Sequence, residues 1–255
     1  MMKNNIFKQL LCIFLICSFI IPQMPITVSA TNRETYFQDI PESQWYADAV
    51  RYVYNNKLMS GITDTTFAPA SNVTRAMFVT VLGRMDGVDV KSYTGNSFKD
   101  VPEGQWYSAY VEWAVQNEIV SGYSAEIFGL NDYITREQMA TIIYRYVNFK
   151  EISLRDSDTA VDGFIDEKYV SAWAKAGLDL MRRTGIIKGN SDGRFNPLNT
   201  ANRAEAATVF MKLHSLIVGA DWISMKFNAL PAVENIVYDD SEHIYYANNI
   251  SIIYY

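Results

Sequence analysis

The chain contains little cysteine and histidine, and it has no surplus of positive charge. Its 255 residues include two cysteines and two histidines, and the formal net charge is −6. This balance argues against a nucleic-acid-binding protein, which would carry a basic surplus. Both cysteines, Cys12 and Cys17, lie near the N-terminus, so the rest of the chain has no disulfide to stabilise it. The fold of that part must therefore rest on packing alone.

Long apolar runs are also missing after the N-terminal segment. Residues 1–30 have the features of a secretory signal peptide: a basic start, an apolar run from Leu10 to Ile21, and small residues at Val28-Ser29-Ala30. The apolar run is too short to span a bilayer comfortably, although an uncleaved membrane anchor is the alternative. We expect an exported chain without a membrane span in its mature part, and a monomer.

Three segments of the chain repeat in one register. Each has a Trp, a Gly 16 residues later, a Phe 22 residues later and an Arg 30 residues later. In chain order these residues are Trp45, Gly61, Phe67 and Arg75, then Trp106, Gly122, Phe128 and Arg136, then Trp173, Gly189, Phe195 and Arg203. Such self-similarity is typical of repeat proteins, in which each unit is one supersecondary element.

Each repeat is predicted to form a helix, a loop and a second helix. The first helix is expected to begin at the Trp and to stop before the recurring Gly, which can adopt a left-handed backbone. The second helix is expected to begin after a capping residue, and the predicted N-caps are Thr74, Thr135 and Asn202. Gln138 and Glu205 complete a capping box, whereas Met77 does not.

An apolar stripe with helical spacing recurs along the second helix. Its members are Phe78, Val81, Leu82 and Met85, with the counterparts Met139, Ile142, Ile143 and Tyr146, and Ala206, Val209, Phe210 and Leu213. Three such helices in one chain most simply bury their stripes against each other as a pseudo-threefold bundle, with the loop Phe holding each loop to it. The predicted fold class is therefore mainly all-α.

The recurring Arg is the least expected residue, because it falls at the first position of the second helix. The positive end of the helix dipole disfavours a cation there by about 0.3–1 kcal/mol. One interpretation is structural, with each Arg paired to a carboxylate such as Asp39 or Asp100. The other is an anion site, in which the guanidinium acts beside the unpaired N–H groups of the helix start. With a Trp to cover the apolar face of a sugar ring, such a site suits an acidic carbohydrate.

The sequence gives less support to a catalytic or a metal-binding function. A glycan-cleaving enzyme usually needs two carboxylates across a cleft, and no recurring acidic pair is present. The acidic candidates are Glu103, Asp132, Glu137 and Glu205. His214 and His243 have no neighbours that suggest a triad or a metal site. The segments 156–158 and 190–193 lack the full calcium-loop pattern and are interpreted as turns. We expect no catalytic residue, no metal and no cofactor.

Several motifs recur: Phe-x-Asp in all three repeats, Trp-Tyr in the first two, and Gly-x-x-x-x-x-Phe-x-Pro in the first and third. The second helices begin with Thr-Arg-Ala-Met, Thr-Arg-Glu-Gln and Asn-Arg-Ala-Glu. Together they resemble the S-layer homology (SLH) domain family. The resemblance implies that the repeats, at 36–86, 97–148 and 163–218, form one unit, a three-pronged spindle around a central three-helix bundle. The Tyr- and Ile-rich tail at 221–255 predicts two short strands, either as a hairpin or as the start of an incomplete domain.

The same resemblance implies a function. In this family the grooves between prongs bind secondary cell wall polymer, a glycan that often carries a pyruvate ketal on N-acetylmannosamine. This binding anchors exported proteins non-covalently to the bacterial cell wall or S-layer. The alternatives are an exported wall-glycan hydrolase and a structural S-layer subunit. The implied glycan-binding residues are Arg75, Arg136, Arg203, Trp45, Trp106, Trp173, Gly61, Gly122 and Gly189, to which we add Asp39, Asp100 and Lys188.

Some of these positions also permit a plainer interpretation. Asp39, Asp100 and Asp166 could cap the entry to the first helix. Lys188 replaces a Ser of the other repeats, so it either makes the third groove more cationic or is an ordinary solvated lysine.

Departures from the family pattern leave open which grooves bind. They are Met77, Leu130, Gln138 and Asn202. Several working grooves on one repetitive polymer would raise the avidity. If the guanidinium groups face the ligand, Arg75→Ala or Arg136→Ala is expected to weaken wall binding with little change in thermal stability.

Overall fold

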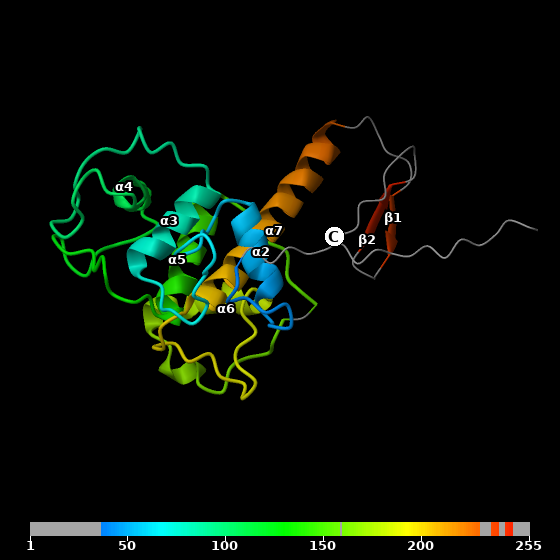
Figure 1. Cartoon of the computed structure of the whole chain (residues 1–255). Helices are drawn as coiled ribbons and strands as arrows, with labels where there is room; N and C mark the ends of the chain where they lie inside the picture. The colour runs from blue at the N-terminus through cyan, green and yellow to red at the C-terminus, as the bar shows by residue number, and fades with distance from the viewer. Residues whose placement is uncertain (1–36, 159, 230–235, 240–242, 247–255) are drawn as a thin grey trace, which may run out of the picture. The chain divides into compact units, whose positions relative to one another are not determined.

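The computed structural model describes residues 37–158, 160–229, 236–239 and 243–246. The fold is mainly α-helical, as predicted (Figure 1). The described helices are α2 (Ala47–Asn55), α3 (Arg75–Met85), α4 (Ser108–Gln116), α5 (Arg136–Phe149), α6 (Lys175–Arg183) and α7 (Arg203–Ala229), with two short 3-10 helices, η2 (Glu167–Tyr169) and η3 (Ala172–Ala174). Within these ranges, no helix has the length and hydropathy needed to cross a membrane. The predicted signal peptide lies outside the described residues.

Each repeat supplies one short helix (α2, α4 or α6) and one second helix (α3, α5 or α7), as the periodicity predicts. The short helices begin two residues after the Trp rather than at it. Their predicted stop at the recurring Gly is also wrong. The left-handed residue after the helix is Lys57 (φ 58°) in the first repeat, Glu118 (φ 57°) in the second and Gly185 (φ 68°) in the third, each four residues before the recurring Gly.

The second helices begin as predicted. Thr74 and Thr135 accept hydrogen bonds from the backbone N–H three residues on, and Asn202 does the same for Glu205 at 2.9 Å. Gln138 completes the capping box of α5, since its Oε1 accepts from the Thr135 N–H at 3.2 Å. Local side chains thus fix where each second helix starts.

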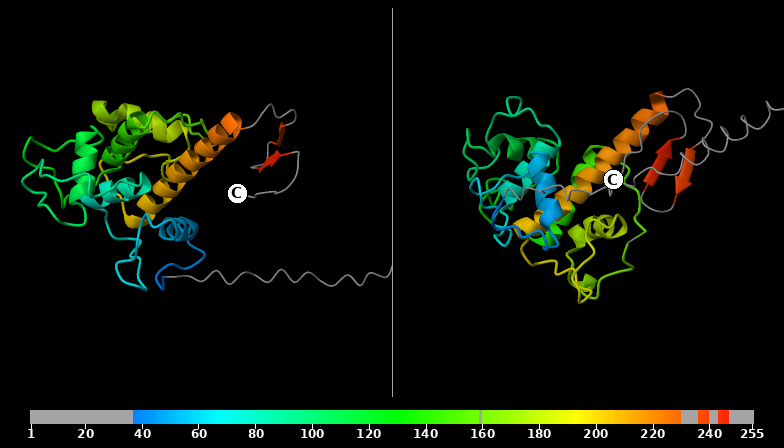
Figure 2. Two further views of the ribbon diagram at one scale, coloured as in Figure 1. Left: turned by 90° about the horizontal axis from the view of Figure 1, so that it is seen from above. Right: turned by 45° about the vertical axis from the view of Figure 1, so that its right-hand side comes forward.

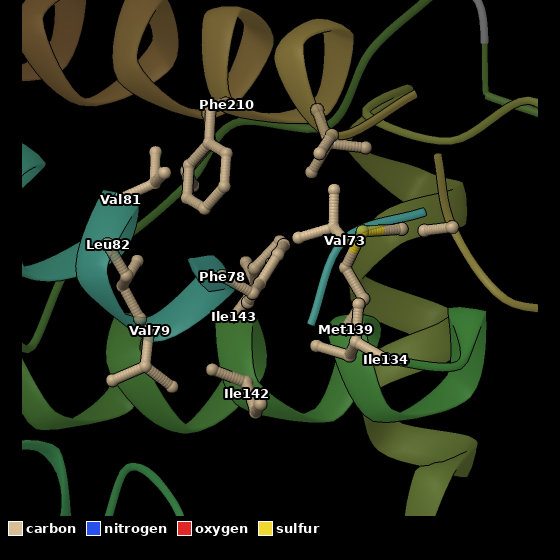
Figure 3. Close-up of a cluster of buried hydrophobic side chains, with 14 of the residues drawn as sticks. Val73, Phe78, Val79, Val81, Leu82, Ile134, Met139, Ile142, Ile143 and Phe210 are labelled. Carbon is tan, nitrogen blue, oxygen red and sulfur yellow. The ribbon is translucent and has the colours of Figure 1, made fainter. Parts of the chain in front are cut away.

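The apolar stripes of the three second helices meet in one core, which Figure 3 shows around Phe78, Met139, Ile143 and Phe210. The rings of Phe78 in α3 and Phe210 in α7 lie 4.7 Å apart between centroids. The three loop phenylalanines are completely buried, as predicted for side chains that hold the loops to the bundle.

The repeats contact one another in a closed cycle. Helix α3 packs against α4 of the second repeat, α5 against α6 of the third, and α7 against α2 of the first (Figure 2). The segments just before the second helices form three antiparallel bridges in the same cyclic manner. They are Thr74 with Tyr133, Thr135 with Thr200, and Asn72 with Asn202. Each repeat is therefore held by both of the others.

The tail differs in part from the predicted strands. Helix α7 continues to Ala229, so the first residues after 221 are helical. Two strands follow, β1 (Ile236–Asp239) and β2 (His243–Tyr246), which pair antiparallel with Ile236 opposite Tyr246.

Candidate functional site

Arg75 is the first residue of α3, as predicted, and its side chain reaches into the loop of the second repeat. Its Nε donates to the carbonyl of Phe128 at 3.1 Å, and its Nη2 donates to the carbonyl of Ser121 at 2.9 Å. The guanidinium lies over the rings of Tyr123 and Phe128, at 4.7 and 4.6 Å from the ring centroids. Arg75 is only 4% exposed, and this burial lowers its pKa from the usual value. The side chain therefore helps to hold the loop of the neighbouring repeat.

Arg203, the first residue of α7, makes the equivalent contacts with the first repeat. Its Nε donates to the carbonyl of Phe67 at 2.8 Å and its Nη2 to the carbonyl of Ser60 at 2.6 Å. The guanidinium also lies 4.4 Å from the centroid of the Phe67 ring. Arg203 thus closes the cycle between the third repeat and the first.

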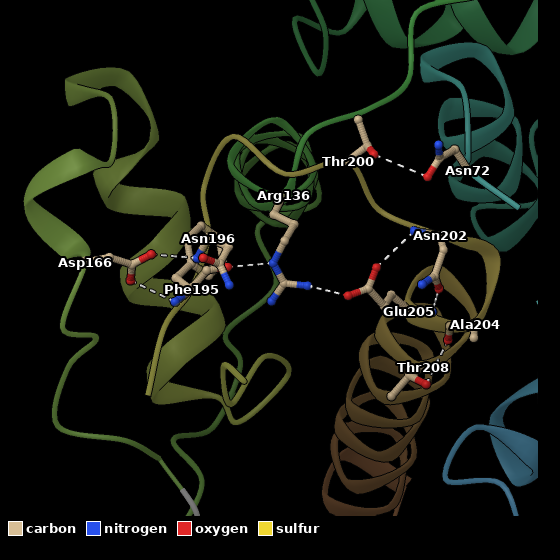
Figure 4. A network of polar contacts seen from close by, with 10 residues as sticks. All are labelled: Asn72, Arg136, Asp166, Phe195, Asn196, Thr200, Asn202, Ala204, Glu205 and Thr208. Atoms are coloured by element: carbon tan, nitrogen blue, oxygen red, sulfur yellow. Dashed lines mark hydrogen bonds and ion pairs between the residues drawn. The ribbon is translucent and has the colours of Figure 1, made fainter. Parts of the chain in front are cut away.

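Arg136, the first residue of α5, is the exception among the three. Its Nε donates to the carbonyl of Phe195 at 2.6 Å, like its counterparts, but its Nη1 forms an ion pair of 2.8 Å with Glu205 (Figure 4). The structural interpretation of a carboxylate partner is confirmed for this Arg, although the partner is neither Asp39 nor Asp100. For Arg75 and Arg203, the hydrogen-bond partners in the described part of the chain are carbonyls.

The three recurring aspartates bind backbone N–H groups of their own loop. Asp39 accepts from Phe67 and Ala68 at 2.8 and 2.6 Å. Asp166 accepts from Phe195 and Asn196, both at 2.8 Å (Figure 4). The interpretation of these aspartates as helix-entry caps is therefore wrong, because their partners lie 28–30 residues further along the chain.

Asp100 makes the fullest set of these contacts. It accepts from Phe128 and Gly129, both at 2.8 Å, and from Leu130 at 3.1 Å. Burial alone would raise the pKa of Asp100, but the hydrogen bonds from the three N–H groups together outweigh it, so that the pKa lies below its ordinary value. The oxygens of Asp39 and Asp100, predicted to contact the glycan, are thus already engaged by the loops.

The recurring glycines occupy places where a side chain would collide with the protein itself. A Cβ at Gly61 would lie 2.5 Å from the Phe37 ring, and one at Gly189 would lie 2.6 Å from the Phe164 ring. Gly122 is packed in the same way against Phe98. These rings belong to the Phe-x-Asp motif, so the recurrence of that Phe was a signal for the contact. Sequence reasoning assigned the glycines to the ligand and missed this structural role.

The backbone N–H groups of the three arginines do not remain unpaired, so that part of the anion-site hypothesis is wrong. Each donates at 2.9 Å to a carbonyl of another repeat, and the acceptors are Asp132, Asn199 and Ser71. The side chains of the three arginines also hold the loops of neighbouring repeats. We therefore no longer expect Arg75→Ala or Arg136→Ala to leave thermal stability unchanged.

The recurring tryptophans behave differently from every other recurring residue. Trp45, Trp106 and Trp173 are 65%, 54% and 53% exposed. Trp45 and Trp106 each meet the following tyrosine edge to face, at 5.3 and 5.0 Å between ring centroids. A large aromatic surface left to solvent at three equivalent positions is available for a ligand. Lys188 is likewise exposed.

Among the residues considered for other chemistry, Glu137 and His214 have structural contacts. Glu137 accepts from the N–H and hydroxyl of Ser171 at 2.9 and 3.0 Å, and Tyr52 is hydrogen-bonded to His214 Nδ1 at 2.9 Å. Over the described ranges, His, Cys, Asp and Glu form no cluster that could hold a metal ion.

Comparison with known proteins gives a consistent assignment. The family model described as the S-layer homology domain matches residues 36–77, 97–140 and 165–207, about half of the chain. A cellulosome-anchoring protein of Acetivibrio thermocellus is 35% identical over 122 residues, which are 45% of this chain and 26% of that protein. An S-layer protein of Bacillus thuringiensis subsp. finitimus is 23% identical over 229 residues, which are 85% of this chain and 27% of that protein.

Glycan-degrading enzymes match as well. The exoglucanase XynX of Acetivibrio thermocellus is 32% identical over 182 residues, which are 71% of this chain but 16% of the enzyme. The chain spans a quarter or less of the length of the first curated relatives it matches.

Proposed function

The chain belongs to the S-layer homology domain family, and we propose that it anchors a protein non-covalently to the bacterial cell surface by binding an acidic cell-wall glycan. The observation that carries the proposal is the exposure of Trp45, Trp106 and Trp173. The other recurring residues, namely the Phe, Asp and Arg of each repeat, hold the loops in place. Among the described residues, the ring contacts of the tryptophans are those of Trp45 and Trp106 with the following tyrosine. A flat aromatic ring is well suited to cover the apolar face of a sugar.

We propose secondary cell wall polymer as the glycan, with a pyruvate ketal as its acidic group. A carboxylate next to a fixed guanidinium would form a charge-assisted hydrogen bond, which contributes about 1.5–3 kcal/mol. One such contact gives modest affinity. Several sites acting on one repetitive polymer would raise the avidity by 10²–10⁴ or so, which gives the threefold repetition a physical purpose.

The names of the relatives support attachment rather than catalysis. An exoglucanase, an amylopullulanase and an S-layer protein differ in what their names describe, yet all three match this chain over a minor part of their length. What such different proteins share is best explained as a common attachment unit. We therefore propose that this chain has no catalytic activity of its own.

The proposal includes export and a single folded unit. A signal peptide at residues 1–30 would direct the chain out of the cell, to the cell wall or S-layer surface. The repeats at 36–86, 97–148 and 163–218 would form a three-pronged spindle that acts as a monomer, and the cyclic contacts between repeats are consistent with it.

Co-sedimentation with purified cell walls tests this function. We expect the protein to sediment with native walls and to stay in solution after mild acid has removed pyruvate. A triple variant with Ala at Trp45, Trp106 and Trp173 is expected to stay in solution with both. Tyr169→Ala is the control, because it removes an aromatic side chain that is 62% exposed but does not recur. Equal sedimentation of the triple variant and Tyr169→Ala would refute the proposal, and release of soluble sugar from the walls would favour the hydrolase.

A further inference from the structure

Each of the three arginines uses two guanidinium nitrogens within the described part of the chain, but the sites differ in the partner of the second nitrogen, which is a carbonyl for Arg75 and Arg203 and a carboxylate for Arg136. Arg75 and Arg203 each donate from Nε and Nη2 to loop carbonyls, and their Nη1 has no partner among the described residues. In that part of the chain, the one buried side-chain nitrogen or oxygen without a partner is Thr80 Oγ1. Neither Nη1 atom is therefore fully buried, although each guanidinium is held in place by its other two nitrogens.

At the Arg136 site, a carboxylate takes the place of the second loop carbonyl. The Nη1 of Arg136 is 2.8 Å from Glu205 Oε1, and the two side chains are 8% and 26% exposed (Figure 4). Glu205 is itself fixed, because its other oxygen accepts from the N–H of Asn202 at 2.9 Å. A carboxylate held this firmly at partial burial competes with any carboxylate arriving from outside.

The cause of the difference is one sequence position, the third residue of each second helix. Glu205 occupies it in the repeat whose loop Arg136 contacts. In the repeat whose loop Arg75 contacts, the same position is Gln138, whose Nε2 lies 3.4 Å from the hydroxyl of Tyr123. The Tyr123 ring in turn lies under the Arg75 guanidinium. By the same cyclic order, the counterpart for Arg203 is Met77. Two sites therefore face a neutral residue, and one faces an acid.

Resting on the proposed function, we infer that the Arg75 and Arg203 sites bind the carboxylates of the glycan, and that Glu205 closes the Arg136 site. The free Nη1 of Arg75 or Arg203 donates to the ligand carboxylate. At Arg136 the guanidinium charge is already paired with the Glu205 carboxylate, which would repel the carboxylate of the ligand. Lys188 adds a positive charge to the third repeat, but it is an exposed point charge on a flexible stem and does not supply a held guanidinium.

A reciprocal exchange at the two equivalent positions tests the inference. Glu205→Gln removes the competing carboxylate, and Gln138→Glu introduces one beside Arg75. Both variants should still fold, because Gln138 already caps α5 through its Oε1, and either side chain can make this bond at either position. Thermal unfolding checks that both variants are folded at the temperature of the titration and measures the stability lost with the Arg136–Glu205 ion pair.

The probe is the methyl glycoside of pyruvylated N-acetylmannosamine, with the same glycoside lacking pyruvate as the control, in a calorimetric titration. We expect about two equivalents bound by the wild type, about one by Gln138→Glu and about three by Glu205→Gln, with none of the control glycoside bound through the guanidinium. On polymeric walls, Gln138→Glu is expected to weaken the apparent affinity roughly 10- to 100-fold, because one contact of a multivalent set is lost.

The outcomes separate the inference from the proposed function. Three equivalents bound by the wild type, or a stoichiometry that neither exchange alters, overturns the closure by Glu205 while leaving glycan anchoring intact. Failure of the wild type to bind both the pyruvylated glycoside and the walls overturns the proposed function, and the inference with it. Binding of the unmodified glycoside with equal affinity overturns the role given to the carboxylate.

Discussion

The recurring residues form two groups in opposite environments, here called the base and the rim of the repeats. At the base, Phe67, Phe128 and Phe195 have no exposed surface, and the aspartates and arginines around them bind the loop backbone. At the rim, the three tryptophans are more than half exposed. Recurrence alone therefore does not separate residues that build a repeat from residues that bind a ligand, since every unit needs both. Burial and hydrogen bonding separate them.

Among the recurring residues, the largest effect on stability is expected from Asp100→Ala at the base. The substitution leaves three loop N–H groups without an acceptor, and we expect the free energy of unfolding to fall by about 3 kcal/mol or more. Chemical denaturation measures this. Glu103→Ala, an exposed change three residues away, is expected to alter it by about 0.5 kcal/mol or less. Similar values for the two variants would show that the aspartate is not part of the structural base.

The titration of Asp100 gives a second test of the same contact. Because the folded state holds the pKa of Asp100 below the unfolded value of 3.8, the carboxylate stabilises the fold above that pH. This contribution is lost as the pH falls below 3.8 and through the lower pKa of the folded state. We expect the free energy of unfolding of Asp100→Asn to depend less on pH in this range than that of the wild type. Parallel pH profiles would contradict the assignment.

The next largest effect is expected from Arg75→Ala, which acts on the base and on the proposed site together. Two hydrogen bonds to loop carbonyls are lost, and we expect about 2–3 kcal/mol of destabilisation. Glycan binding, measured well below the unfolding temperature, is expected to weaken as well. Arg75→Lys keeps the positive charge but lacks the planar, two-pronged donor of the guanidinium. It should therefore retain part of the glycan binding but recover little of the lost free energy of unfolding. An unchanged free energy of unfolding in Arg75→Ala would show that this side chain contributes to ligand binding alone.

These contacts mark the limit of what the sequence could predict. The N-caps Thr74 and Thr135 were predictable because a cap and its partner lie three residues apart. The partners of Arg75 lie 46 and 53 residues away, in another repeat, and no local pattern contains them.

The prediction that the first helix of each repeat ends at the recurring Gly was wrong for a related reason. Glycine is the usual left-handed residue, yet Lys57 and Glu118 adopt this conformation where the helix ends. The nearby Gly61 is required by the packing of Phe37 instead. The sequence showed correctly which residues recur. It could not show which of them face inward, because burial depends on contacts between repeats.

Smaller changes in the free energy of unfolding are expected from substitutions at the left-handed residue that follows the loop Phe, with opposite signs in the first and second repeats. This residue is Ala68 in the first repeat (φ 61°) and Gly129 in the second (φ 83°). A non-glycine residue in this conformation costs roughly 1–2 kcal/mol. We therefore expect Ala68→Gly to stabilise the protein by up to about 1 kcal/mol, after the added flexibility of the unfolded chain is counted. Gly129→Ala is expected to destabilise it by about 1–2 kcal/mol, because the new Cβ would also crowd the Tyr123 ring. Urea denaturation of both variants measures the pair, and equal signs would contradict the strain at Ala68.

The smallest effect on stability, with the clearest effect on binding, is expected from Trp106→Ala at the rim. The side chain is 54% exposed, so its removal should change the free energy of unfolding by about 0.5 kcal/mol. Wall binding should weaken roughly tenfold, because one of several contacts to the polymer loses its stacking surface. The matched control is Trp113 in α4 of the same repeat, which is 2% exposed. Trp113→Ala should destabilise the protein by about 3–5 kcal/mol, while the fraction that remains folded binds walls as the wild type does. If Trp106→Ala instead lost stability and kept its binding, the rim would belong with the base, and the distinction between the two would no longer hold.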